Sequence, residues 1–192
     1  MKTDIILAGV GGQGILSIAT IIGEAATKAG LNLKQAEVHG MSQRGGDVQS
    51  NLRLSNETIY SDLIPRGKAD LIIAMEPMEA LRYVEFLSPD GVIVTSSKPF
   101  INIPNYPDQT ELFKELDSQN KVVRLDIEEM AKEIKAPKSA NVILLGMAAP
   151  FLDILSADEL RSAVGRVFSS KGEAIVEANY KAFDFGYENA NK

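Results

Sequence analysis

Two glycine-rich segments in the first quarter of the chain hold the residue types best suited to binding an anion. They are Gly9-Val10-Gly11-Gly12-Gln13-Gly14 and Glu37-Val38-His39-Gly40-Met41-Ser42-Gln43-Arg44-Gly45-Gly46. Glycine lets the backbone approach a phosphate closely, and an arginine guanidinium can bind phosphate or carboxylate with two hydrogen bonds. Runs this rich in glycine and polar residues are typical of exposed loops that carry function.

The first segment follows a short apolar run from Asp4 to Ala8 and precedes apolar residues at helical spacing up to about Ala29. A helix that starts after such a loop presents free N–H groups and the positive end of its dipole to a phosphate. Glu37 comes 23 positions after Gly14, close to the roughly 20 expected for a ribose-binding acid. The alternative is that the glycines only let the helix pack closely on the strand. Three glycines fit the pattern G-x-G-x-x-G: Gly9, Gly11 and Gly14.

The second segment contains Arg44 immediately before two glycines, and it contains His39, the single histidine of the chain. Consecutive glycines can form an anion-binding nest, to which the guanidinium would add its own contacts. The alternatives are that Arg44 pairs with a nearby acid and that His39 is a structural, hydrogen-bonded residue. We expect this loop to contribute the following site residues: His39, Ser42, Gln43, Arg44, Gly45 and Gly46.

Composition excludes several classes of protein. The chain has 192 residues, a length that favours a single domain spanning residues 1–192. Its formal net charge of -6 argues against a nucleic-acid-binding surface. No apolar run approaches the roughly 18 residues needed to span a bilayer, and no secretory signal pattern is present. We therefore expect a cytoplasmic protein that binds neither nucleic acid nor membrane.

The residues available for catalysis are few. The chain has no cysteine and one histidine, so disulfides, thiolate nucleophiles and cysteine-bound iron–sulfur clusters are excluded and the usual acid–base pairs cannot be assembled. The sequence shows no cluster of metal ligands. We assign no catalytic acid or base.

Short apolar runs, which predict strands, alternate along the chain with segments whose apolar residues recur at helical spacing. This alternation predicts an α/β fold. Alternation from Val48 to Leu54 indicates a half-exposed strand, and Thr58 to Ser61 a short returning strand that would complete an antiparallel hairpin. Residues 88–91 read as a turn, and the prolines between Pro99 and Pro107 indicate an extended arm. The other expected strands are 4–8, 31–38, 69–75, 92–95 and 121–126, and the expected helices are 14–29, 77–87, 108–118 and 127–135.

The C-terminal part, about 138–189, is predicted to be helical. Ala140 to Leu155 is strongly apolar and too long for a strand, and Ser156 to Glu159 is a capping box that opens another helix. Ser170 to Glu173 has the spacing of a further capping box. The predicted fold is a three-layer α/β/α sandwich around a Rossmann-like, mainly parallel sheet with an antiparallel hairpin addition.

Taken together, the two glycine segments resemble the gamma-type subunits of 2-oxoacid:ferredoxin oxidoreductases. The resemblance continues through Tyr60 to Pro65 and from Ala69 to Arg82, and it becomes loose after about Val94. Val38 to Gln43, directly before Arg44, is similar to the arylpyruvate branch, most like the beta subunit of indolepyruvate ferredoxin oxidoreductase.

This resemblance implies a subunit of an enzyme that decarboxylates a 2-oxoacid, such as indolepyruvate or a related arylpyruvate. Thiamine diphosphate and 4Fe-4S clusters supply the chemistry, coenzyme A takes the acyl group and ferredoxin takes the electrons. The chain has neither cysteines nor the family's Gly-Asp-Gly thiamine signature. Thiamine diphosphate and clusters must then lie on a larger alpha subunit, through which ferredoxin is reached, and the chain is not expected to be active alone.

Coenzyme A is the ligand we expect at the first loop, with Gly9, Gly11, Gly12, Gln13 and Gly14 as its binding residues. The second loop or the prolines from Pro99 to Pro107 should form the subunit interface, and a homodimer is the alternative assembly for the isolated chain. Two other functions remain open on the sequence alone: a stand-alone NAD-dependent oxidoreductase using the first loop and Glu37, and a nucleotide-binding module.

Overall fold

The computed structural model describes residues 1–39 and 45–190, and its centre is a six-stranded sheet in the order β2-β3-β1-β4-β5-β6. Of these strands, β3 runs antiparallel to both of its neighbours, and the others run in one direction. The predicted mainly parallel sheet with an antiparallel addition is therefore confirmed. The strands are β1 (Lys2–Val10), β2 (Asn32–His39), β3 (Asp47–Ser55), β4 (Ala69–Ala74), β5 (Leu87–Ser96) and β6 (Val122–Leu125).

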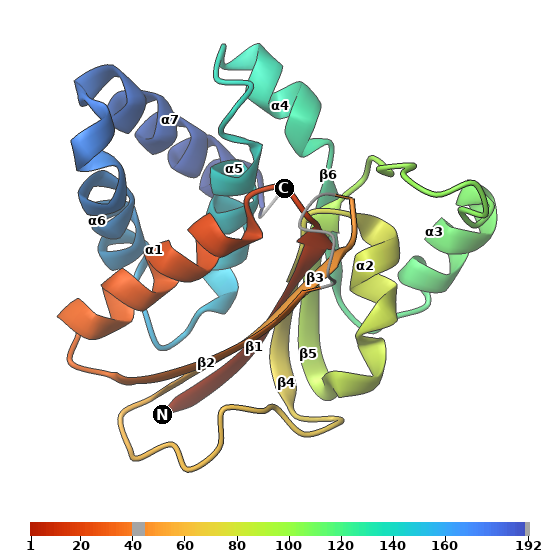
Figure 1. Cartoon of the computed structure of the whole chain (residues 1–192), viewed down its shortest axis with the longest axis horizontal. Coiled ribbons are helices and arrows are strands. Elements are labelled where there is room, and N and C mark those ends of the chain that lie inside the picture. The colour runs from red at the N-terminus through yellow and green to blue at the C-terminus, as the bar shows by residue number, and fades with distance from the viewer. Residues whose placement is uncertain (40–44, 191–192) are drawn as a thin grey trace.

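Helices cover both faces of this sheet and give the predicted three layers (Figure 1). One face carries α1 (Ile15–Lys28), α4 (Ile127–Glu133), α5 (Ala140–Ala148), α6 (Ala157–Phe168) and α7 (Glu173–Asn189). The other face carries α2 (Pro77–Arg82) and α3 (Gln109–Asp117). Short 3-10 turns lie at Val84–Phe86, Ala149–Phe151 and Ser169–Lys171.

The antiparallel part of the sheet differs from the prediction. Residues 58–61 form no strand; β3 instead lies between β2 and β1 and pairs with both along its length. In this central position Leu52 and Leu54 are completely buried. More apolar surface is therefore removed from water than in a hairpin at the edge of the sheet. Residues 56–68 instead connect β3 to β4 at the edge of the sheet where β1 begins. The Arg53 guanidinium holds this segment by donating to the carbonyls of Ser61 and Leu63 at 3.0 and 2.9 Å.

Three smaller predictions are also wrong. Residues 88–91 belong to β5, where the register against β4 shifts between Ala69 and Leu71 instead of the chain turning. The apolar helix from Ala140 ends at Ala148 because Pro150 follows and the chain tightens into a 3-10 turn. At the start of α7 the N-cap is Gly172, with φ +95° and no side-chain cap, so the capping box predicted at 170–173 does not form.

Local signals place the ends of the other helices. Helix α1 ends before Gly30, whose φ of +72° suits a C-terminal cap, and the Leu31 N–H donates to the Ala26 carbonyl at 2.9 Å. At α6 the predicted capping box is confirmed: Ser156 accepts from the Glu159 N–H, and the Glu159 side chain accepts from the Ser156 N–H. These caps set the ends of the two helices, and Arg166 of α6 donates to Glu24 of α1 at 2.8 Å.

Alternate residues of β1, β4 and β5 contribute to two separate apolar cores on the two faces of the sheet. Ile5 and Leu7 of β1 pack under α1 and α4–α7, whereas Ile6 and Ala8 face α2 and α3. Every residue of α5 from Asn141 to Ala148 is buried, as predicted for an apolar helix. Among the described residues, no helix is both long and apolar enough to cross a bilayer.

Candidate functional site

Three irregular segments meet at the carboxyl edge of the sheet. The parallel strands β1, β4 and β5 end there at Val10, Ala74 and Ser96, and the antiparallel β3 begins there at Asp47. Ligands of open α/β sheets bind outside this edge. It brings together the first glycine loop, the end of the second glycine loop and the proline-containing segment 97–108, which we call the proline arm.

Backbone hydrogen bonds join the two glycine loops directly. The Gly11 N–H donates to the Gly46 carbonyl at 2.8 Å, and the Gly45 N–H donates to the Gly11 carbonyl at 3.4 Å. The proline arm joins the same group, because the Asn102 side-chain amide donates to the Gly45 carbonyl at 2.8 Å. Segments separated by 34 to 57 positions thus form one structural unit.

Within the first loop the glycines have different tasks. A Cβ on Gly9 would lie 2.9 Å from Cγ1 of Ile15, so at this position the glycine allows close helix–strand packing. Gly12 and Gly14 have φ of +103° and +88°, which side-chain-bearing residues adopt rarely. The packing interpretation therefore applies to Gly9, whereas Gly12 and Gly14 give the loop its shape. The Gln13 carboxamide accepts from the Val10 N–H at 2.7 Å and braces this shape from within.

Asn141, at the start of α5, holds the far side of the loop. It donates to the Gly14 carbonyl at 3.2 Å, and a Cβ on Gly14 would lie 2.8 Å from its Nδ2 atom. Nothing near position 141 in the sequence indicated this role. Helix α1 itself starts with no side-chain cap and no acidic residue in its first turn. Its positive dipole end therefore faces the loop without a built-in counter-charge, an arrangement that suits an anion.

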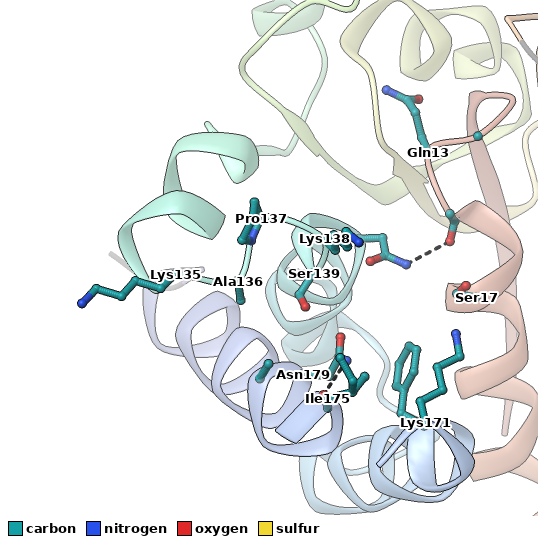
Figure 2. A pocket seen from close by; sticks show the side chains of 15 residues that line it. Gln13, Ser17, Lys135, Ala136, Pro137, Lys138, Ser139, Lys171, Ile175 and Asn179 are labelled. Atoms are coloured by element: carbon teal, nitrogen blue, oxygen red, sulfur yellow. Dashed lines mark hydrogen bonds between the residues drawn. The ribbon is translucent and has the colours of Figure 1, made fainter. Parts of the chain in front are cut away.

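Two hollows flank the first glycine loop, and Gly12 and Gly14 line both. The smaller, about 350 Å³, lies toward β2 and β3 and includes Glu37 and Val48; we call it the Glu37 hollow. The larger, about 580 Å³, lies between α1, α5 and α7 and includes three lysines (Figure 2); we call it the lysine pocket. The ribose-binding position predicted for Glu37 thus lies at a hollow that the loop lines.

A buried carboxyl group fastens the proline arm to this edge. Glu76 is fully buried at the N-cap of α2, and it accepts from the Glu79 N–H at 2.9 Å, the Phe100 N–H at 3.4 Å and the Tyr106 hydroxyl. Burial raises the pKa of Tyr106 well above its usual range, and the hydrogen bond to Glu76 adds to the rise. The sequence signal for this role is an acidic residue between an apolar strand and Pro77.

The neighbouring titratable groups are paired or shielded. Glu79 binds Arg82 with two hydrogen bonds at 3.0 and 3.2 Å, yet burial raises the pKa of Glu79 more than this ion pair lowers it. Burial also raises the pKa of Tyr83 to about 12. Among the described residues, no group of three or more metal-binding side chains is placed to hold an ion. These groups build the α2 side of this edge.

Part of the predicted site lies outside the described residues: Ser42, Gln43, Arg44 and the side chain of His39. The structure brings together the remainder, namely Gly9, Gly11, Gly12, Gln13, Gly14, Gly45 and Gly46.

The fold and this glycine-loop edge define a class of α/β proteins that bind ligands at the carboxyl ends of their strands. Comparison with known proteins defines the class further. Residues 4–189 match the family described as Pyruvate ferredoxin/flavodoxin oxidoreductase. An indolepyruvate oxidoreductase subunit IorB from Archaeoglobus fulgidus is 35% identical over 198 residues, covering 99% of this chain and 96% of its own.

Two solved structures agree. The gamma subunit of a keto/oxoacid ferredoxin oxidoreductase from Geobacter sulfurreducens superposes with a TM-score of 0.74 at 26% identity, with 98% of each chain covered. A 2-oxoglutarate:ferredoxin oxidoreductase from Magnetococcus marinus, with 2-oxoglutarate, coenzyme A and succinyl-CoA bound, superposes with a TM-score of 0.79 at 25% identity. That match covers 99% of this chain and 31% of the Magnetococcus chain.

The chain belongs to the pyruvate ferredoxin/flavodoxin oxidoreductase family. The predicted family, fold and class of 2-oxoacid:ferredoxin oxidoreductase subunits are confirmed. The comparisons give no support to a stand-alone NAD-dependent enzyme.

Proposed function

We propose that this chain is the small, cluster-free subunit of an indolepyruvate or related arylpyruvate:ferredoxin oxidoreductase. The observation that carries the substrate assignment is the 35% identity to an indolepyruvate oxidoreductase subunit along nearly the whole of both chains. The reaction is oxidative decarboxylation of the 2-oxoacid to an acyl-coenzyme A, with electrons passed to ferredoxin. Thiamine diphosphate, when bound to the partner, supplies the carbanion chemistry.

The first glycine loop fits a phosphate-bearing ligand, and coenzyme A is the ligand we assign to it. Gly12 and Gly14 hold backbone conformations that favour glycine, and α1 starts without a capping side chain or an acidic residue. Such a terminus stabilises the negative charge of a phosphate through its free N–H groups and its dipole. One neighbouring structure, the Magnetococcus enzyme, has coenzyme A bound, which supports the assignment. The binding residues are Gly9, Gly11, Gly12, Gln13 and Gly14.

The partner in this proposal is a larger alpha subunit that carries thiamine diphosphate and the 4Fe-4S clusters. A chain without cysteine cannot bind such clusters through thiolates. The Magnetococcus chain, of which this chain covers 31%, supports a larger neighbour in the assembly. Ferredoxin would then be reached through that subunit.

The second glycine loop and the proline arm form the proposed interface. Phe100 and Ile101 of the arm keep 43% and 62% of their surface exposed, which is costly in water unless a partner covers them. The arm is anchored at Glu76 and Gly45, so it offers a preformed surface. We place His39, Ser42, Gln43, Arg44, Gly45 and Gly46 beside the composite active site.

Reconstitution tests this assignment. Ferredoxin reduction is measured with indolepyruvate, pyruvate and 2-oxoglutarate, using the chain alone, the larger subunit alone and the two together, with thiamine diphosphate and coenzyme A supplied. Only the mixture should turn over, and indolepyruvate should give the highest kcat/KM. Full turnover by the chain alone would exclude the proposed division of labour, and a preference for pyruvate or 2-oxoglutarate would overturn the substrate assignment.

A further inference from the structure

The lysine pocket has the size and walls of a site for a small organic ligand. Its volume of about 580 Å³ falls within the roughly 300–1,000 Å³ typical of ligand pockets. The first glycine loop and Ser17 form one wall, the segment joining α4 to α5 forms the roof, and α7 forms the floor (Figure 2). Phe168, Ile175 and Ala178 give it an apolar side.

The charge of the pocket is opposite to that of the chain. Three lysines line it, Lys135, Lys138 and Lys171, and no Asp or Glu is among the described residues that line it. The whole chain has a net charge of -6. None of the three lysines forms an ion pair within the described ranges. Lys171 instead places its Nζ 5.1 Å from the centre of the Phe168 ring, so all three ammonium groups remain available to an anion.

A hydroxyl group on the pocket wall offers a ligand a polar contact. Ser139 lines the pocket with only 5% of its surface exposed, and it makes no capping hydrogen bond to α5. Among the described residues no hydrogen bond reaches its side chain. Its oxygen points toward the Asn179 carboxamide on the opposite wall (Figure 2). This hydroxyl is therefore free to hydrogen-bond a polar group of a ligand in the pocket.

Backbone strain also occurs at this site. Lys135 has φ +59°, the one positive φ of a non-glycine residue in the described part of the chain. It follows α4 at a position that glycine usually occupies. A lysine there costs stability that glycine would restore, and Lys135 lines the rim of the pocket with its side chain extended away from the other labelled residues (Figure 2).

We propose that the lysine pocket binds a phosphorylated ligand of nucleotide size. Its phosphates lie toward the lysines and the first turn of α1, and its uncharged body lies against Phe168 and Ile175. Ser139 and Asn179 hydrogen-bond the hydroxyl or amino groups of that body. Gly12 and Gly14 contribute to this pocket with the face of the loop opposite the Glu37 hollow.

Two sources of this ligand share the same chemistry. One is the phosphorylated adenosine end of coenzyme A, a source that rests on the function proposed above. The other is a free adenosine phosphate, whose binding would be independent of that function. Inorganic phosphate, ADP and coenzyme A are the probes that separate them.

Calorimetric titration of the full chain, alone and in complex with its larger subunit, tests the pocket. The triple variant Lys135→Gln/Lys138→Gln/Lys171→Gln removes the pocket charges. The control Lys28→Gln/Lys34→Gln/Lys68→Gln makes the same charge change at exposed lysines outside the pocket. We expect the Kd for ADP to rise by about tenfold or more in the pocket variant and to change little in the control.

The outcomes separate the sources. Competition between ADP and coenzyme A, with both weakened by the pocket variant, assigns the adenosine end of coenzyme A. ADP binding that coenzyme A leaves unaffected assigns a free nucleotide. Equal weakening by both triple variants, inorganic phosphate binding as tightly as ADP, or no ADP binding to chain and complex would each overturn the proposal. If Gly12→Ala leaves coenzyme A use intact while ADP still binds here, the coenzyme A assignment fails and the pocket stands.

A single variant separates binding from folding. Lys135→Gly should raise the Tm, because glycine adopts φ +59° without strain, and at the same time weaken ADP binding. A purely structural role for Lys135 would leave ADP affinity unchanged. A lower Tm would contradict the strain described above.

Discussion

The two faces of the sheet are built in different ways. The face under α1 and α4–α7 is a large apolar core, in which α5 is buried from Asn141 to Ala148. The face under α2 and α3 has a much smaller apolar cluster and several buried polar groups, among them Asp4, which pairs with Arg53, and the carboxyl of Glu76. Figure 1 shows the corresponding imbalance, with α1 and α4–α7 on one side of the sheet and α2 and α3 on the other.

The two faces therefore have different roles: one stabilises the fold, and the other fastens the segments at the edges of the sheet. The apolar face holds the fold together through packing, which is not directional. Polar groups on the other face are directional: Arg53 fixes residues 61–63, and Glu76 fixes the proline arm. We infer that substitutions on the first face act mainly on global stability, whereas those on the second act on the proposed interface.

The largest effect is expected at the contact of α5 with α7. A Cβ on Gly146 would overlap the carbonyl oxygen of Phe183, so Gly146→Ala forces two buried helices apart and should cost about 3 kcal/mol. Gly23→Ala in α1 is the control, since its Cβ would meet only the Leu33 side chain at 3.3 Å. Helix propensity should make this variant up to about 1 kcal/mol more stable. Urea unfolding measures the free energy of unfolding of both variants. Equal changes in Gly146→Ala and Gly23→Ala would contradict the role of the α5–α7 contact.

A smaller effect is expected at Glu76. Glu76→Gln replaces one of its two accepting oxygens by an amide that faces a donor, so we expect a loss of about 2 kcal/mol. The loss should be local: amides of the proline arm should exchange faster with solvent than the core does. Tyr106→Phe removes one hydrogen bond and should cost about 1 kcal/mol. Arm amides that keep wild-type protection in Glu76→Gln would show that Glu76 does not anchor the arm.

The smallest effect is a pH dependence from Glu79. Because burial raises the pKa of Glu79 above its ordinary 4.5, the native state binds more protons than the unfolded chain in this range. Its contribution to stability is therefore greatest below pH 4.5 and declines as the pH rises through the raised value. Glu79→Gln should gain stability relative to wild type over that interval. Unfolding curves at stepped pH that stay parallel would contradict this sign.

The sequence predicted those parts of the fold whose signals are local. The apolar strand before Gly9, the helix from Ile15, the C-terminal cap at Gly30 and the capping box at Ser156 all follow from neighbouring residues. The position of β3 between β2 and β1 could not be predicted in this way. It depends on pairing with both neighbouring strands, that is, on contacts between residues far apart in the sequence.

The same distinction applies to the candidate site. Each glycine loop was visible in the sequence, but the bonds from Gly11 to Gly45 and Gly46 join residues more than 30 positions apart. The lysine pocket is less predictable still, since Lys135, Lys138 and Lys171 come from two segments with no common motif. Asn141 and Asn102 acquire their roles only through tertiary contacts.

The affinity of the reconstituted complex for coenzyme A tests most directly whether the first glycine loop holds this ligand. Gly12→Ala and Gly30→Ala are matched variants: both positions have positive φ, +103° and +72°, and no atom of residues 1–39 and 45–190 would lie within 4 Å of either Cβ. Each variant adds comparable backbone strain, and only one alters the loop. We predict that Gly12→Ala raises the Kd for coenzyme A by about tenfold or more while Gly30→Ala leaves it unchanged. Equal affinities in the two variants would contradict the assignment of coenzyme A to this loop.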